Sequence, residues 1–132
     1  MSPTIDTRFF IAHFLANTND LKLKIKNKMI ELQREEAIVP TIVLHEVYKS
    51  VTDIAGKDVA DLLVRSILKS NFTITDLTSD IAILSAQIRN KYKGIPTADA
   101  IIAATAIKSK TRGVISDDPH FKSIKEIKTQ WL

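Results

Sequence analysis

The sequence predicts an α/β protein in which a mostly parallel sheet lies between layers of helices. Short β-branched runs alternate with longer segments whose apolar residues recur at helical spacing. The 132 residues suffice for one hydrophobic core, and no internal repeat or glycine- and proline-rich linker divides them. Strands that alternate with helices form parallel sheets covered on both faces. We therefore expect one three-layer α/β/α domain spanning residues 1–132, with four to five strands.

The first strand and two helices are predicted within residues 4–35. Thr4–Ile5 is a short β-branched strand, and the apolar residues that follow recur at helical spacing over residues 7–15. Residues 21–26 alternate apolar residues with lysine, as a strand does. The helical spacing continues through residue 35, however, and this length favours a helix. Asn19 and Asp20 are its expected N-terminal cap.

The next segment predicts a strand and two helices. The apolar run Ala37–Val39 is typical of a buried strand, which Pro40 ends because proline has no N–H for the sheet. Thr41 then caps a helix of valines and leucines that reaches the glycine at position 56. Residues 57–69 have the apolar stripe of a further amphipathic helix.

The second half repeats this alternation. Residues 72–74 form a strand, and residues 79–92 form a helix that ends near Gly94. Residues 96–99 open a helix over residues 100–107 that has almost no polar face, so we expect it to be buried. A strand over residues 113–116 then leads into a turn at residues 117–119, and a last strand lies within residues 127–132.

Composition excludes several classes of protein. Hydrophobic residues make up 45% and charged residues 26%, which is typical of a globular protein rather than a disordered or fibrous one. No apolar run approaches the roughly 20 residues of a membrane span, and the N-terminus lacks the features of a signal peptide, so we expect a cytoplasmic protein without a membrane partner. The absence of cysteine excludes disulfides, a thiol nucleophile and thiolate zinc sites. The net charge of +4 permits a polyanionic partner but does not prove one.

Five carboxylates occupy positions that folding alone would not favour. Asp6 follows the first strand, Asp117 and Asp118 follow the fourth, and ligands of such sheets bind at strand ends. Glu46 lies among apolar residues of one helix, and Asp99 lies in the first turn of the nearly all-apolar helix. Several acids in one pocket repel each other unless a cation binds there. Oxygen ligands of this kind favour Mg²⁺ or Mn²⁺.

Each acid also has a purely structural explanation. Asp118 suits the N-cap of a helix that begins at Pro119, and Asp99 suits the favourable dipole of a first turn. Glu46 has Lys49 or Arg8 as a candidate salt-bridge partner, and Asp6 suits the cap of the helix that follows it. These explanations are satisfactory one by one and strained when taken together.

Four stretches of the chain resemble PIN-domain ribonucleases, in particular the VapC-type toxins of prokaryotic toxin–antitoxin pairs. They are Ile5-Asp6-Thr7, Thr41-Ile42-Val43-Leu44-His45-Glu46-Val47, Thr97-Ala98-Asp99-Ala100-Ile101-Ile102-Ala103-Ala104-Thr105-Ala106 and Val114-Ile115-Ser116-Asp117-Asp118-Pro119-His120-Phe121. They span nearly the whole chain in the expected order. The third stretch is the most specific, and the first would be weak alone.

The resemblance implies a function and a set of site residues. It implies a nuclease that cleaves single-stranded RNA with Mg²⁺ or Mn²⁺, often as a homodimer, leaving a 5′-phosphate and a 3′-hydroxyl, and restrained by an antitoxin protein. By position, Asp6, Glu46, Asp99 and Asp118 are its catalytic and metal-binding acids, with Glu46 as an outer ligand or the group that positions water.

Positions around these acids depart from the family pattern. Asp117 stands where Gly or Asn is usual, so either Asp117 or Asp118 is the fourth ligand. Ser116 stands where Thr is typical and keeps the hydroxyl group. Thr7 provides a second hydroxyl next to Asp6. Arg8 replaces a small polar residue and is expected to contact either a substrate phosphate or a nearby acid.

Other interpretations remain. An RNA-processing nuclease of housekeeping type and a non-catalytic binding module would share the fold, although a degenerate module should lack one of the acids. A receiver-like phosphoacceptor lacks support because Asp6 has no second acid beside it, and Lys49 stands where a zinc protease needs histidine. We interpret His120 as an ordinary helix-end histidine and Trp131 as a core residue rather than a base-stacking one.

Overall fold

The computed structural model describes residues 2–132, and within that range five strands alternate with seven helices. The strands are β1 (Thr4–Ile5), β2 (Ile38–Pro40), β3 (Thr73–Thr75), β4 (Val114–Ile115) and β5 (Thr129–Gln130). The helices are α1 (Thr7–Leu15), α2 (Asn19–Arg34), α3 (Thr41–Ala55), α4 (Lys57–Lys69), α5 (Ser79–Lys91), α6 (Thr97–Lys108) and α7 (Pro119–Lys122). The predicted fold class is confirmed.

The sheet is parallel throughout and its strand order is β3-β2-β1-β4-β5. The chain first builds outward from β1 to β2 and β3, and then returns to the other side of β1 with β4. The connections that leave β1 and β4 therefore run in opposite directions. Such a switch point opens a crevice at the carboxyl ends of the two strands, which is where open α/β sheets bind ligands.

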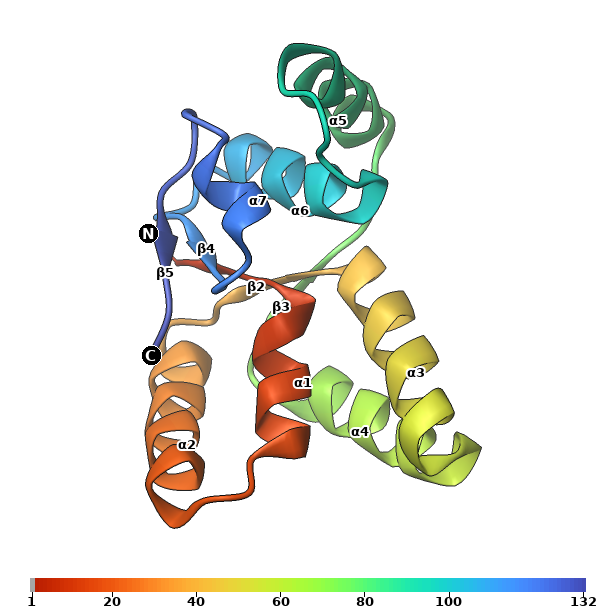
Figure 1. Cartoon of the computed structure of the whole chain (residues 1–132), viewed down its shortest axis with the longest axis vertical. Coiled ribbons are helices and arrows are strands. Elements are labelled where there is room, and N and C mark those ends of the chain that lie inside the picture. Colours follow the sequence, from red (N-terminus) through yellow and green to blue (C-terminus); the bar gives the residue numbers. More distant parts are fainter. Residues whose placement is uncertain (1) are drawn as a thin grey trace.

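Helices cover both faces of the sheet, with α5 and α6 on one side and α1, α2 and α4 on the other (Figure 1). Helix α6 packs against β1, β2, α3 and α5, and its residues 99–106 are all buried. This explains why the sequence of α6 is almost entirely apolar. It also means that Asp99, in its first turn, is held rigidly beside the strands.

The starts of two helices differ from the prediction. Residues 19–34 are helical, but the cap is Thr18, whose hydroxyl accepts the backbone N–H of Leu21 at 3.2 Å. Asn19 and Asp20 are already helical, so their prediction as caps is wrong. Thr41 is likewise the first residue of α3 rather than its cap. Strand β2 runs through Pro40 directly into that helix, which leaves no turn for a side chain to cap.

The second half differs in its boundaries. Helix α6 begins at Thr97, because Pro96 already stands at its N-cap, and not at residue 100. The predicted turn after β4 contains the short helix α7, with Asp118 at its N-cap and Pro119 as its first residue. Strand β3 is shifted by one residue from its predicted position, and β5 is shorter than the segment predicted to contain it. Among the helices of residues 2–132, none has the length and apolarity that a membrane span requires.

Candidate active site

Asp6 lies at the switch point of the sheet. Ile5 of β1 pairs with Ile115 of β4, so the residues that follow them are neighbours although they are 110 positions apart in the chain. The Ser116 hydroxyl donates a hydrogen bond of 2.6 Å to Asp6 Oδ2. Asp6 is only 2% exposed. It stands at the predicted N-cap position of α1, but its side chain makes no capping hydrogen bond, so capping does not account for the carboxylate.

Asp99 and Asp118 meet beside Asp6, and His120 lies between them. His120 Nδ1 is 2.9 Å from Asp118 Oδ1 and 3.1 Å from Asp99 Oδ2. Asp99, Asp118 and His120 each offer one potential metal-ligand atom, and these three atoms lie within 4.8 Å of one another. The structure thus places Asp118, rather than Asp117, in the acidic cluster.

His120 was missed by the sequence analysis, which treated it as a helix-end histidine. Helix α7 is too short to carry a periodic pattern, so nothing in the spacing marked the residue. The available signal was its position two residues after Asp118. The short helix turns both side chains toward α6, because Asp118 caps the helix by accepting the His120 N–H at 2.9 Å.

Asp118 has the capping role that the sequence offered for it, and its position is compatible with the predicted role of a metal ligand. It caps α7, as the structural explanation held, and its carboxylate also faces Asp99. The Asp118 N–H donates to Ser116 Oγ at 3.0 Å. Since Ser116 donates to Asp6 in turn, one hydroxyl fixes two acids relative to each other.

Glu46 reaches the cluster from α3, the helix that follows β2. Its Oε1 accepts a hydrogen bond of 2.6 Å from the hydroxyl of Thr7, the first residue of α1. Neither predicted salt bridge forms, because Lys49 pairs with Asp53 and Arg8 pairs with Asp117. Glu46 is thus held by a neutral donor and forms no salt bridge within residues 2–132.

Asp117 and Arg8 form an ion pair on the outer side of the cluster. Arg8 Nε lies 2.5 Å from Asp117 Oδ1, and the two side chains are 53% and 40% exposed. Of the two expected contacts of Arg8, the structure contains the one with an acid. Asp117 points to this partner and takes no part in the cluster of Asp99, Asp118 and His120.

The crowding of acids shifts their proton affinities. Burial, assisted by the charges of Asp99 and Glu46, raises the pKa of Asp6 from 3.8 to about 7, against the opposing hydrogen bond from Ser116. Burial also raises the pKa of Asp99 from 3.8 to about 6, with Asp118 and Glu46 adding to the effect and His120 opposing it. The raised pKa values of Asp6 and Asp99 mean that the site has too little positive charge to stabilise both carboxylates in their ionised form.

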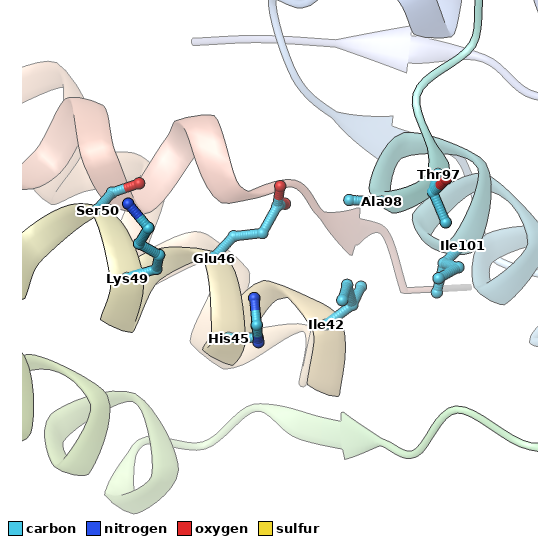
Figure 2. A pocket seen from close by; sticks show the side chains of 8 residues that line it. All are labelled: Ile42, His45, Glu46, Lys49, Ser50, Thr97, Ala98 and Ile101. Atoms are coloured by element: carbon cyan, nitrogen blue, oxygen red, sulfur yellow. The ribbon is translucent and has the colours of Figure 1, made fainter.

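A groove borders the cluster, with a volume of about 340 Å³. Glu46 and Ile42 of α3 form one wall and Thr97, Ala98 and Ile101 of α6 the other, with the Glu46 carboxylate directed across toward α6 (Figure 2). Lys49 lies one turn beyond Glu46 on the same helix. Of the four candidate acids, Glu46 alone lines this groove, so a chain molecule bound there would lie against Glu46.

The residues of the cluster fit a divalent cation. His120 Nδ1 is enclosed and has no hydrogen-bond partner within residues 2–132, although two carboxylate oxygens lie close to it. A cation between these atoms would satisfy the nitrogen and both carboxylates at once. Carboxylates as the main donors favour Mg²⁺ or Mn²⁺, and imidazole is better tolerated by the softer ions.

Comparison with known proteins finds similarity over almost the whole chain. A family profile described as PIN domain matches residues 4–127. VapBC2 from Rickettsia felis, solved with a fragment of promoter DNA, superposes with a TM-score of 0.80 at 18% identity, over 99% of this chain and 98% of that one. VapC20 from Mycobacterium tuberculosis, described as a sarcin–ricin loop cleaving toxin, gives 0.78 at 16% identity over 94% and 95%. FitAcB from Neisseria gonorrhoeae gives 0.73 at 21% identity over 96% and 94%.

No curated protein sequence matches the chain. At identities this low, the structural similarities establish a shared fold and no more. The family profile, in contrast, covers almost the entire chain, including all four candidate acids. The chain belongs to the PIN domain family.

Proposed function

We propose that this PIN domain is a Mg²⁺- or Mn²⁺-dependent endoribonuclease that cleaves single-stranded RNA and acts as the toxin of a type II toxin–antitoxin pair. The observation that carries the proposal is the convergence of Asp6, Glu46, Asp99 and Asp118 from four separate elements on one switch point. A module that only binds RNA or protein has no need for four adjacent acids, whose mutual repulsion opposes both folding and the approach of RNA.

Each residue has a task that follows from its contacts. Asp99 and Asp118, with His120 between them, would hold the divalent ion, and Asp6 would add a carboxylate from the neighbouring strand end. The ion would supply Lewis-acid polarisation of a phosphate ester and favour the ionisation of water. Ser116 keeps Asp6 and Asp118 in register through its two hydrogen bonds. Glu46, whose Oε1 is fixed by Thr7, has its second oxygen available to orient the attacking water and accept its proton.

The test is cleavage of a mixed single-stranded RNA with Mg²⁺ or Mn²⁺ and with EDTA. We expect metal-dependent cleavage that Asp6→Asn and Asp99→Asn each reduce by at least about 100-fold. Asp80→Asn is the matched control, because Asp80 is an exposed acid in the first turn of α5 and should not affect the rate. Circular dichroism must show that all three variants are folded.

Activity that persists in EDTA or in both site variants would contradict the proposal. A wild-type protein that neither cleaves RNA nor binds Mn²⁺ would favour the non-catalytic module instead.

The proposed role as a toxin is supported by the proteins that share the fold. The fold is shared with VapBC2 and FitAcB, and a toxin–antitoxin complex from Klebsiella pneumoniae superposes with a TM-score of 0.68 at 21% identity. We expect expression of the wild type to arrest growth, Asp99→Asn to abolish the arrest, and the neighbouring small gene to restore growth. An active nuclease that causes no arrest would instead be an RNA-processing enzyme. A homodimer in solution is part of the proposal and can be measured by light scattering.

A further inference from the structure

A second hollow, of about 370 Å³, reaches Thr7 and Asp117, which neighbour the acids Asp6 and Asp118 in the sequence. Its walls come from the start of α1, the end of β4 and the residue after β5. Six of the residues that line it are Thr7, Arg8, Ile11, Ala12, Asp117 and Trp131. None of the four candidate acids lines it, so the metal chemistry does not account for it.

This hollow adjoins the groove between α3 and α6. Ser50 of α3 lines both, and Thr7 on the wall of the second hollow donates its hydrogen bond to Glu46 on the wall of the first. A single strand that crosses the acids would therefore have one neighbouring nucleotide over the groove and another over the second hollow.

The two depressions differ in chemistry. The groove has aliphatic walls and His45, whereas the second hollow is lined by the indole of Trp131. Trp131 contacts the buried ring of Phe9 at an angle of 83°, with centroids 6.2 Å apart. An edge-to-face contact uses at most one face of the indole, so Trp131 is anchored without being enclosed.

The polar groups of the second hollow suit a base and its phosphate. Within residues 2–132, the one side-chain hydrogen bond of Arg8 runs from Nε to Asp117, which leaves its terminal amino groups available to a phosphate. Asp117 offers acceptor oxygens at the same rim. An aromatic face, a guanidinium and an acceptor together form the usual recognition set for an unpaired nucleobase.

We propose that the second hollow binds a nucleobase of the RNA substrate next to the cleaved phosphate, stacked on Trp131. The proposal rests on the proposed nuclease function and adds the site through which the enzyme selects its cleavage position. Trp131 packs against the core through Phe9, as the sequence predicted, and as a half-buried residue it would also determine specificity.

The chain provides its own probe, because Trp131 is its only tryptophan. Indole fluorescence is followed while a single-stranded RNA hexamer is added in EDTA, which prevents cleavage. We expect saturable quenching by the hexamer and none by an abasic hexamer of the same charge. Equal quenching by both would show that the phosphates act on the indole through charge alone, and would overturn the proposal.

Two variants separate stacking from packing. Trp131→Leu keeps apolar volume against Phe9 but removes the flat face, whereas Trp131→Phe keeps a flat face. We expect Trp131→Leu to lower kcat/KM about 10- to 100-fold, mostly through KM, and Trp131→Phe to recover most of the loss. Thermal denaturation identifies a variant that fails to fold, and in that case the fluorescence titration of the wild type decides.

The outcomes distinguish this proposal from the nuclease function. Metal-dependent cleavage with unaltered kinetics in Trp131→Leu and no base-dependent quenching would overturn the base site and leave the nuclease intact. Base-dependent quenching without cleavage under any metal would support the base site and contradict the nuclease. The product of the neighbouring small gene is titrated in the same way. If this protein changes the Trp131 fluorescence and RNA does not, the hollow docks a protein and the proposal is wrong.

Discussion

The residues at the switch point form a site whose own charges oppose its formation. Asp6 and Asp99 are buried beside each other, and Glu46 and Asp118 add further negative charge. Within the described chain, the one basic side chain in direct contact with the cluster is His120, which is charged only when protonated. A protein optimised for stability alone would not retain this arrangement, because uncompensated buried charge is costly.

Among these residues, Thr7 offers the clearest test of positioning. Its hydroxyl donates to Glu46 Oε1 at 2.6 Å, so Thr7→Val should leave the carboxylate free to rotate. We expect kcat to fall about 10- to 150-fold with little change in KM, because a hydrogen bond to a charged group contributes about 1.5–3 kcal/mol. Thr7→Ser keeps the hydroxyl and should retain most of the activity. A loss in Thr7→Ser as large as in Thr7→Val would show that the hydroxyl is not what matters.

For single residues, the sequence identified the acids of the site but not the side chains that form hydrogen bonds with them. Glu46 and Asp99 were found because each is a carboxylate among apolar residues, and Asp6 and Asp118 because they follow predicted strands and match the family pattern. The contacts of Thr7 with Glu46 and of Ser116 with Asp6 join residues 39 and 110 positions apart, and no local pattern predicts such pairs. His120 was overlooked for the same reason.

The bounds of helices were predicted well where the apolar residues follow one clear periodicity. They were predicted less well where the residues at the helix boundary determine the first helical position. Helix α4 matches its predicted bounds, since its apolar stripe is unambiguous. The cap of α2 and the start of α6 were misplaced, because a proline or threonine near a boundary is compatible with several positions. In α7, the Asp-Pro sequence suits both a turn and a helix start, and tertiary packing selects the helix.

The junction before β4 depends on Gly113. Its φ of +150° is rarely adopted by other residues, and a Cβ there would lie 2.6 Å from the carbonyl oxygen of Lys128. That oxygen cannot move away, since it accepts the Val114 N–H at 2.9 Å and so joins β4 to the neighbouring chain segment. Gly113→Ala must therefore disturb the pairing that positions Ser116 and Asp118.

We expect Gly113→Ala to lower the free energy of unfolding by about 2–4 kcal/mol in urea denaturation. Gly56→Ala is the matched control, because Gly56 also has a positive φ, of +91°, but has nothing within 4 Å of its Cβ position. It should lose only about 1 kcal/mol. Equal losses in the two variants would mean that the contact with Lys128 relaxes without cost.

For the whole molecule, the sequence predicted the class of fold but not the strand order. Alternating strands and helices imply a parallel sheet, and they leave open which strands are neighbours. The pairing of β1 with β4 is what brings the first and the last quarter of the chain together and creates the switch point. It depends on the fit of entire layers, which local periodicity does not encode.

The same carboxylates should couple the stability of the whole molecule to pH and to metal. The pKa of Asp6 is about 7 in the folded protein and 3.8 in the reference state, so the folded state binds more protons between these values. Stability of the metal-free protein should thus fall as pH rises from about 4 to about 7, by on the order of 4 kcal/mol for Asp6. The measurement is urea denaturation in EDTA across this range. Asp6→Asn should flatten the profile, and a wild-type profile with the same slope as that of Asp6→Asn would contradict the assignment.

A divalent cation should reverse this dependence, because it binds the ionised acids of the folded state and competes with protons. We expect Mn²⁺ to raise the Tm of the wild type clearly at pH 8 and little at pH 5, where Asp6 and Asp99 are largely protonated. Asp6→Asn should lose most of the increase at pH 8, while the exposed-acid control Asp80→Asn should keep it. An increase of the same size at both pH values would place the ion on other groups. The acids that destabilise the fold without metal would then not be those that bind it.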